Sequence, residues 1–426
     1  MEIAVVWFRR DLRLEDNVAL NRALQSGLPV LPIFVFDQQI LIELPENDAR
    51  VSFIYSTLQG IHHKLKESAS SLGVFYGDVR SVWKDIVSKF NVKKVFYNRD
   101  YEPYALNRDR EVSCFLAEQG LEVVSCKDQV VFEPDEVLKA DGKPYLIYTP
   151  YKNKWLLRFT ENDVAQTTSI LDNYLKVDLL FPTLQSLGFV ESEIKVQQFQ
   201  LDDLSNYSKE RDFPAQDKGS YLSPHLRFGT ISVREVIRRT RGSDPVFLNE
   251  IIWREFFMQI LYHFPKVVDH NFHQKYDTMQ WRNDEDDFKR WCEGQTGYPM
   301  VDAGMRQLNT TGYMHNRVRM VVASFLCKHL LIDWRWGEAY FAEKLLDYDL
   351  SANIGNWQWA AGTGCDAAPY FRIFNPSEQL KKFDKNLSYT QKWVPEVLSG
   401  TYVAPMVDHR FARERTLSAF KNALQK

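Results

Sequence analysis

Short apolar runs alternate with longer amphipathic stretches over the first 125 residues. The apolar runs cover residues 3–7, 30–36, 73–76 and 94–97. Each run has the length of a buried strand, whereas stretches such as 51–72 carry apolar residues at helical spacing. Parallel strands need helix-length crossovers, so strands that alternate with helices are typical of a parallel sheet. The pattern predicts an α/β domain with a Rossmann-like parallel sheet over residues 1–125.

The pattern changes twice after this region. Residues 126–197 break into short pieces punctuated by proline and glycine, which predicts a long interdomain connector. Helical periodicity then returns over residues 232–240, 247–262 and 318–331, without a convincing strand between them. We therefore expect residues 198–426 to form an all-α domain.

Length and composition favour a protein of two or three domains. The chain has 426 residues, 45% of them hydrophobic, and a single core stops growing below this size. No run of 18 apolar residues occurs, and the N-terminal segment is charged where a signal peptide is apolar. The five cysteines are scattered, which disfavours a disulfide framework and a clustered metal site. We expect a cytoplasmic monomer with no membrane partner and no metal.

The charge pattern leaves two interpretations open. The formal net charge of -3 disfavours a generally basic nucleic-acid binder. Many arginines nevertheless lie in the second half of the chain, and such a cluster is either a solvated face or a local basic groove. These arginines are Arg211, Arg227, Arg238, Arg239, Arg241, Arg254, Arg317, Arg319 and Arg372. No G-x-G-x-x-G or Walker sequence supports a standard nucleotide site.

One segment combines residue types that a core helix does not need. Residues 356–376 read NWQWAAGTGCDAAPYFRIFNP. Small residues let the backbone approach a large flat partner, tryptophans offer faces for stacking, and Arg372 can bind a phosphate. The mixture predicts a site that holds a planar group beside a polyanion.

This segment strongly resembles the cryptochrome/photolyase flavoproteins, in which the same stretch forms part of the flavin and damaged-DNA pocket. The resemblance extends over essentially the whole chain. It is most specific in the stretches WFRRDLRLEDN, NEIIWREFF, GYMHNRVRM and DYDLSANIGNWQW.

The resemblance implies an FAD site in the helical domain. Arg319 and Asp347 would pair beside the flavin ring, and Asn353 would face its reactive nitrogen. Ser220 and Ser223 lie where a loop meets a helix start, so they can receive the pyrophosphate. The implied FAD-binding residues are Tyr207, Gly219, Ser220, Tyr221, Leu222, Ser223, Phe247, Arg254, Asn316, Arg319, Asp347, Tyr348, Asp349 and Asn353.

The resemblance also implies a chain of tryptophans that carries an electron from the protein surface to the flavin. Trp357, Trp334 and Trp281 match its three positions, while Trp291 is a family position outside that chain. Taken singly, each tryptophan is more often a core residue, because aromatic side chains dominate core burial. The residues with an implied catalytic role are Glu250, Trp281, Trp334, Trp357 and Asn353.

The substrate implied by the resemblance is DNA containing a cyclobutane pyrimidine dimer, flipped out of the duplex. Trp253 and Trp359 would contact the apolar faces of the dimer, and Glu250 would hydrogen-bond its polar edge. Arginines would bind phosphates on either side of the lesion. The implied substrate-binding residues are Arg211, Glu250, Trp253, Asn316, Arg317, Met320, Trp359 and Arg372.

The implied activity is that of a class I photolyase, in which excited reduced FAD donates an electron that splits the dimer. The alternatives are a cryptochrome photoreceptor and a (6-4) photoproduct photolyase. Asn353 stands where plant-type cryptochromes tend to have an acid and animal-type ones a cysteine. Met320 stands where (6-4) enzymes need a histidine. We expect a bacterial-type enzyme, associated with the nucleoid when it is bound to DNA.

Several positions depart from the family pattern. Ile354 and Asn356 replace an asparagine and a glycine near the flavin, and Phe247 and Tyr313 replace tryptophans of some relatives. Tyr104 and Ala105 stand where folate-binding relatives have an Asn-Glu pair. We therefore expect any second, antenna chromophore to be a deazaflavin or flavin rather than a folate.

Overall fold

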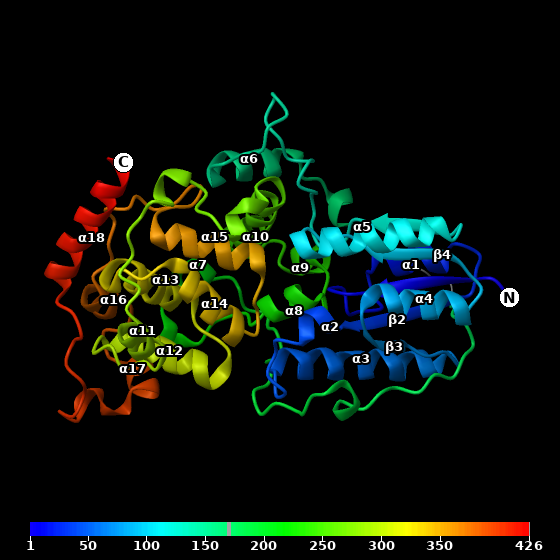
Figure 1. Cartoon of the computed structure of the whole chain (residues 1–426), viewed down its shortest axis with the longest axis horizontal. Coiled ribbons are helices and arrows are strands. Elements are labelled where there is room, and N and C mark those ends of the chain that lie inside the picture. The colour runs from blue at the N-terminus through cyan, green and yellow to red at the C-terminus, as the bar shows by residue number, and fades with distance from the viewer. Residues whose placement is uncertain (168–171, 426) are drawn as a thin grey trace. The chain divides into compact units, whose positions relative to one another are not determined.

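The computed structural model describes residues 1–167 and 172–425. The chain forms two compact units that interleave along the sequence (Figure 1). The α/β unit comprises residues 1–136, 155–201 and 221–241, and the helical unit comprises residues 137–154, 202–220 and 242–426. The three predicted domain ranges, which include residues 168–171 and 426 outside the described residues, stay a prediction.

The α/β unit contains a five-stranded parallel sheet in the order β3-β2-β1-β4-β5. Its strands are β1 (Ile3–Phe8), β2 (Val30–Asp37), β3 (Gly73–Gly77), β4 (Val92–Asn98) and β5 (Glu122–Cys126). The four predicted strands and the predicted α/β class are confirmed. The fifth strand escaped prediction because β5 is an edge strand, half exposed, and has no continuous apolar run.

Helices cover both faces of this sheet. Successive side chains of a strand point to opposite faces, so Val6 of β1 lies in one buried core and Trp7 in the other. Helices α1 (Val18–Leu24) and α3 (Ala49–Glu67) complete the first core, and α4 (Val79–Lys89) and α5 (Pro103–Glu118) complete the second. The remaining helices of this unit are α2 (Gln38–Leu41), α8 (Ser223–Phe228) and α9 (Val233–Arg239).

Buried ion pairs attach residues 221–241 to the α/β unit. The guanidinium of Arg234 in α9 lies 3.2 Å from a carboxylate oxygen of Asp16 and 2.8 Å from one of Asp128. A Cβ atom at Gly229, where φ is +66°, would lie 2.1 Å from the carbonyl oxygen of Arg10. The opening stretch WFRRDLRLEDN therefore has a structural role, since it binds a segment distant in sequence.

The helical unit consists of helices and loops, and its described residues 242–425 contain no β-strand. The predicted all-α character of this part of the chain is confirmed. Its helices are α7 (Tyr207–Glu210), α10 (Pro245–His263), α11 (Glu285–Cys292), α12 (Pro299–Thr311), α13 (Asn316–Ser324), α14 (Trp334–Lys344), α15 (Leu350–Ala361), α16 (Pro376–Phe383), α17 (Ser388–Trp393) and α18 (His409–Leu424). Helix α6 (Tyr148–Arg158) contributes residues to both units.

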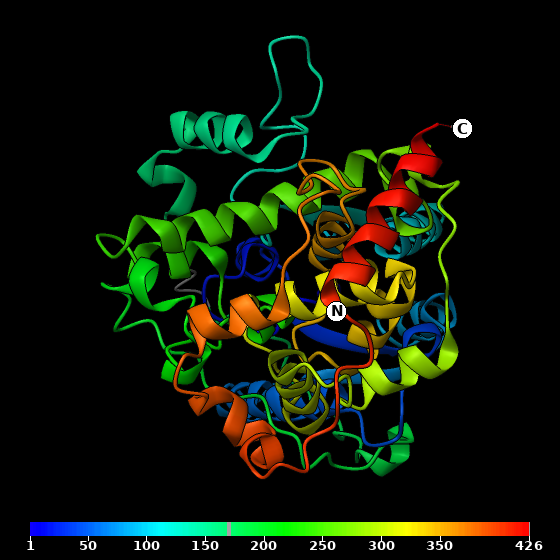
Figure 2. The same cartoon turned by 90° about the vertical axis from the view of Figure 1, so that its left-hand side faces the viewer.

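Shorter helical segments complete the chain. The π-helical segment η6 (Phe325–Leu330) continues α13, and α18 packs against it (Figure 2). The 3-10 helices are η1 (Glu161–Val164), η2 (Gln185–Leu187), η3 (Pro214–Gln216), η4 (Pro265–Val268), η5 (Gln274–Tyr276) and η7 (Pro395–Leu398).

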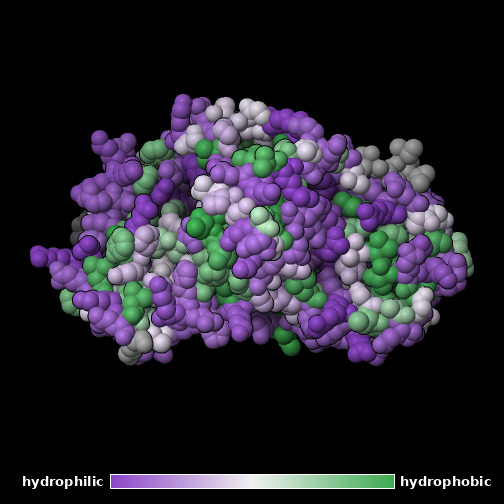
Figure 3. Space-filling model, turned by 90° about the horizontal axis from the view of Figure 1, so that it is seen from above, coloured by the Kyte–Doolittle hydropathy of each residue, from purple (hydrophilic) through white to green (hydrophobic). Residues whose placement is uncertain are grey.

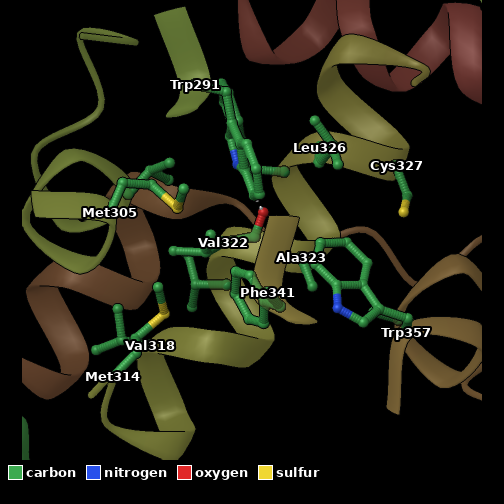
Figure 4. Close-up of a cluster of buried hydrophobic side chains, with 14 of the residues drawn as sticks. Trp291, Met305, Met314, Val318, Val322, Ala323, Leu326, Cys327, Phe341 and Trp357 are labelled. Atoms are coloured by element: carbon green, nitrogen blue, oxygen red, sulfur yellow. Dashed lines mark hydrogen bonds between the residues drawn. The ribbon is translucent and has the colours of Figure 1, made fainter. Parts of the chain in front are cut away.

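The core of the helical unit is built around two tryptophans. Trp291 and Trp357 are almost fully buried, and their ring centroids lie 6.2 Å apart (Figure 4). The indole N–H of Trp291 donates a hydrogen bond of 3.3 Å to the carbonyl oxygen of Val322. A buried indole that finds such an acceptor avoids the cost of an unpaired donor.

Two glycines let aromatic rings reach the helix backbone of this core. A Cβ atom at Gly337 of α14 would lie 2.2 Å from Cη2 of Trp357. A Cβ atom at Gly355 of α15 would lie 2.1 Å from Cδ1 of Phe257 in α10. Real Cβ atoms do not approach other atoms this closely, so both positions need glycine for packing.

None of the described helices is long and apolar enough to cross a membrane. The described residues contain no group of three or more His, Cys, Asp or Glu that could hold a metal ion. Hydrophilic side chains cover most of the face in Figure 3, and apolar side chains occur there in small separate groups.

The packing around Gly355 leads to a stability prediction. We expect Gly355→Ala to lower the free energy of unfolding by about 1 to 3 kcal/mol, because the added methyl group overpacks the contact with Phe257. The matched control is Gly60→Ala in α3, where a Cβ atom would meet nothing within 4 Å. There alanine should raise stability by up to about 1 kcal/mol through its higher helix propensity. Thermal denaturation compares the two variants, and equal midpoints would contradict the prediction.

Candidate functional site

Helix α10 holds two of the predicted site residues on one face. Its start is fixed by the side chain of Asp244, which accepts a backbone hydrogen bond as N-cap, and by Pro245 in the first turn. Glu250 and Trp253 lie three residues apart and are therefore neighbours on the helix surface. Both side chains are half-buried.

Glu250 is paired with an arginine that precedes α10 in the sequence. A guanidinium nitrogen of Arg211 lies 2.5 Å from a carboxylate oxygen of Glu250. Burial raises the pKa of Glu250, and the charge of Arg211 only partly offsets this. Arg211 also lies over the ring of Tyr207, whose edge meets Phe247 with centroids 5.1 Å apart. The structure thus brings together four residues that the sequence predicted for substrate or flavin.

The predicted pairing of Arg319 with Asp347 is present. The Nη2 atom of Arg319 lies 2.9 Å from a carboxylate oxygen of Asp347, and its Nε donates to the carbonyl oxygen of Met314 at 2.7 Å. The carboxylate is almost fully buried, with a side-chain exposure of 6%. A guanidinium held at two of its nitrogens presents its charge in a fixed place.

Asn353 is held by a residue that the sequence analysis missed. Asp349 caps α15 by accepting from the N–H of Ala352, and Asn353 follows within the first turns. The amide of Asn353 donates to a carboxylate oxygen of Glu338 in α14 at 2.9 Å and to its carbonyl oxygen at 3.1 Å. Burial raises the pKa of Glu338. No local pattern marks Glu338, because its role depends on the packing of α14 against α15.

The three tryptophans of the predicted electron chain have different surroundings. Trp357 is buried against Trp291 and Phe341, at centroid distances of 6.2 and 5.0 Å. The buried indole N–H of Trp334 donates to Asn271 at 2.9 Å. Trp281 is half-buried, with its ring centroid 6.2 Å from that of Phe420. Their roles in electron transfer stay predictions.

The predicted phosphate-binding segment is divided between the two units. Gly219 and Ser220 belong to the helical unit, and residues 221–223 belong to the α/β unit. Tyr221 has a φ of +50°, and Ser223 is the exposed first residue of α8. A Cβ atom at Gly219 would meet nothing within 4 Å. The binding role of this segment therefore stays a prediction.

The remaining predicted substrate residues lie on α13, on α15 and in the segment after it. Arg317 forms an ion pair of 2.8 Å with Asp212. Asn316 is exposed at the start of α13, whereas Met320 and Trp359 are half-buried. Arg372 is exposed in the segment that follows α15. An exposed arginine can reach a polyanion without losing a buried partner.

The sequence analysis also missed Tyr148, which it assigned to the interdomain connector. The ring of Tyr148 stacks on the indole of Trp253, with centroids 3.6 Å apart and planes inclined by 8°. Its hydroxyl donates to the carbonyl oxygen of Asn249 at 2.8 Å. The contact joins residues far apart in sequence, so local periodicity gives no sign of it.

The residues of the helical unit fit a bound flavin. The Arg319–Asp347 pair offers a positive charge of fixed position, and the amide of Asn353 is held in one orientation. Such groups can stabilise a planar ring that becomes anionic on reduction. Arg254 and Tyr348, also predicted to bind flavin, lie half-buried in this unit.

Comparison with known proteins agrees with this description. Residues 4–169 match the family described as DNA photolyase, and residues 247–401 match the FAD binding domain of DNA photolyase. A relative from Synechococcus sp. named deoxyribodipyrimidine photo-lyase is 36% identical, and the alignment covers 98% of this chain and 96% of the relative.

Solved structures share the whole fold. A bacterial class III photolyase from Agrobacterium tumefaciens is 36% identical with a TM-score of 0.91, covering 100% of this chain and 98% of that chain. An archaeal photolyase from Sulfolobus tokodaii, solved with two FAD molecules, is 35% identical with a TM-score of 0.85. That match covers 99% of this chain and 100% of the archaeal chain.

A parallel-sheet unit combined with a helical FAD-binding unit defines a flavoprotein of the cryptochrome/photolyase fold. Within this class, the chain belongs to the DNA photolyase family. The predicted family, fold and lyase class are confirmed.

The start of α13 leads to a prediction about pH. The Nδ1 atom of His315 caps α13 by accepting from the N–H of Arg317 at 3.2 Å, and burial lowers the pKa of His315 to about 4. The unfolded chain therefore binds more protons between pH 6.5 and 4, so stability falls as the pH falls through this range. His315→Asn keeps a good capping group but has no imidazole to protonate. As the pH falls over this range, its free energy of unfolding should decrease by about 2 kcal/mol less than that of wild type.

Denaturant unfolding at pH 7 and pH 4.5 measures the effect. The matched control is His63→Asn at an exposed position of α3, which should keep the wild-type pH dependence. An unchanged pH dependence in His315→Asn would show that His315 does not contribute to acid instability.

Proposed function

We propose that this protein uses light to split cyclobutane pyrimidine dimers in DNA, as the name of its relatives indicates for them. The observation that carries the proposal is the arrangement on α10, where Glu250 and Trp253 share a face and Arg211 adjoins Glu250. An indole offers apolar surface to a pyrimidine dimer, and a carboxylate such as that of Glu250 can accept a hydrogen bond from an N–H group at the polar edge of the dimer.

The proposed cofactor site uses the residues around α13 and α15. Asp347 would hold the positively charged guanidinium of Arg319 beside the flavin ring, and Asn353 would contact the edge of the ring. FAD, when bound and reduced, supplies upon excitation the electron that opens the dimer. Glu338 would keep the amide of Asn353 in one orientation by accepting its hydrogen bond.

The side chains proposed to contact DNA differ in how far they are exposed. Trp359 and Met320 would contact the lesion as half-buried apolar side chains. Arg372 would bind a phosphate beside the lesion, because it is exposed. Asn316 would hydrogen-bond the polar edge of the dimer together with Glu250.

The finer assignments are part of the same proposal. The predicted class I specificity is proposed although one similar structure is named a class III photolyase. A second chromophore of flavin or deazaflavin type is proposed for the α/β unit, and one similar structure is named as holding two FAD molecules. The carboxyl ends of parallel strands are the usual place for a ligand in this architecture. Asp37 at the end of β2 accepts a hydrogen bond of 2.6 Å from the hydroxyl of Tyr104 there. A cytoplasmic, monomeric protein is also proposed.

Illumination of defined oligonucleotides tests the proposed function. We expect the purified, fully reduced protein to restore oligonucleotides that carry a cyclobutane dimer and to leave those with a (6-4) photoproduct unchanged. Chromatography of the products measures repair, with a dark incubation as control. Repair of the (6-4) lesion alone would overturn the substrate assignment, and repair of neither lesion would favour the cryptochrome alternative.

The tryptophan chain gives a separate prediction. Trp281→Phe should slow light-driven reduction of the oxidised protein by about tenfold or more, because phenylalanine loses an electron far less readily than tryptophan. Repair by chemically reduced protein should stay near the wild-type rate. Trp393→Phe, which replaces another half-buried tryptophan of this unit, is the matched control. Equal slowing in both variants would contradict a specific role for Trp281.

A further inference from the structure

Tyr148 makes several contacts in the helical unit. Its ring stacks on Trp253 with centroids 3.6 Å apart. Its hydroxyl donates to the carbonyl oxygen of Asn249 at 2.8 Å, and its backbone N–H donates to the carboxylate of Asp366 at 2.9 Å. Tyr148 itself is 7% exposed.

These contacts join two parts of the proposed lesion site. Asn249 and Trp253 are separated by one helical turn of α10, so the ring and hydroxyl of Tyr148 hold the same helix face. Asp366 lies between α15 and Arg372, in a backbone conformation with φ of +46°. Tyr148 therefore connects the helix that carries Trp253 to the segment that carries Arg372. A projecting loop precedes Tyr148 in the sequence, as Figure 2 illustrates.

The stack restricts the indole of Trp253. Phe256 and Phe257 contact the same indole at centroid distances of 5.5 and 5.4 Å, so its ring plane is held from several sides. The side chain of Trp253 remains half-buried, which leaves part of it accessible. An aromatic side chain that is already held in its binding orientation loses less entropy when a ligand arrives.

We propose that Tyr148 is a positioning residue for lesion recognition, which fixes the plane of Trp253 before damaged DNA binds. This inference rests on the proposed function, because Trp253 acts in it as a contact of the lesion. Tyr148 contributes through Trp253 and need not touch the substrate.

The hydrogen bonds of Tyr148 also help to fix the position of its ring against Trp253. The charge of nearby Glu250 and burial both raise the pKa of Tyr148, burial being the larger cause, so its hydroxyl stays protonated and keeps donating to Asn249. The ring provides most of the restriction, since it alone faces the indole. Tyr148→Phe keeps the ring, whereas Tyr148→Leu removes the stack while retaining apolar volume.

Binding of dimer-containing and undamaged oligonucleotides tests the proposal. Tyr148→Leu should weaken dimer binding about five- to tenfold and leave binding of undamaged DNA unchanged, since it removes an aromatic pair. Tyr148→Phe should stay within about twofold of wild type, because the stack persists. At saturating dimer DNA, the repair yield of Tyr148→Leu should stay near wild type, which separates positioning from chemistry.

A double-mutant cycle identifies the partner. In a Trp253→Ala background, Tyr148→Leu should cause no further loss of dimer affinity, because the side chain it positions is absent. Tyr145→Leu, which removes a neighbouring aromatic ring that contacts Tyr151 instead, is the matched control and should bind dimers like wild type. Flavin absorbance and the thermal midpoint of each variant verify that it is folded.

The outcomes separate this inference from the proposed function. If wild type prefers dimer DNA but Tyr148→Leu prefers it equally, the positioning role is wrong and the proposed function stands. The positioning role is also wrong if Tyr148→Leu lowers dimer affinity by the same factor in the Trp253→Ala background as in wild type. If wild type binds dimer and undamaged DNA equally, the proposed function fails and the inference fails with it.

Discussion

Close packing against α15 is the constraint on which the helical unit depends. Trp357 lies over Gly337 of α14, and Phe257 of α10 lies over Gly355 of α15. Neither contact leaves room for a methyl group. The distance between these helices is therefore set by an aromatic ring that lies directly against a helix backbone. Protein interiors packed to this density transmit small shifts from one side chain to the next. Because α10, α14 and α15 all carry residues of the proposed site, these two contacts also set its geometry.

Charge pairing is a second constraint on the proposed site. The basic side chains of Arg211, Arg317 and Arg319 each lie within 3 Å of a carboxylate oxygen. Removing one member of a partly buried pair leaves the other charged and poorly solvated, so each carboxylate fixes its arginine. A pair can still orient a bound anion, although its net charge is small. The exposed Arg372 differs from these three, because it remains available to a phosphate.

Two residues outside the conspicuous motifs contact residues of the proposed site. Glu338 holds the amide of Asn353, and Tyr148 stacks on Trp253. Both act on a residue that the family resemblance had already singled out. Positioning residues of this kind are spread along the chain, since a side chain is held by whatever packs beside it in three dimensions. Their chemistry is ordinary, and only their location relates them to the site.

The sequence by itself determined the parallel sheet, the all-helical second half and the family, because strand and helix periodicity and long motifs are local properties. It also predicted the Arg319–Asp347 pair through the family resemblance. It missed β5, whose half-exposed edge lacks an apolar run. The tertiary structure alone decided that residues 221–241 join the α/β unit and that Tyr148 and Glu338 contact Trp253 and Asn353. These features depend on contacts between distant residues, and such contacts leave no periodic trace in a single sequence.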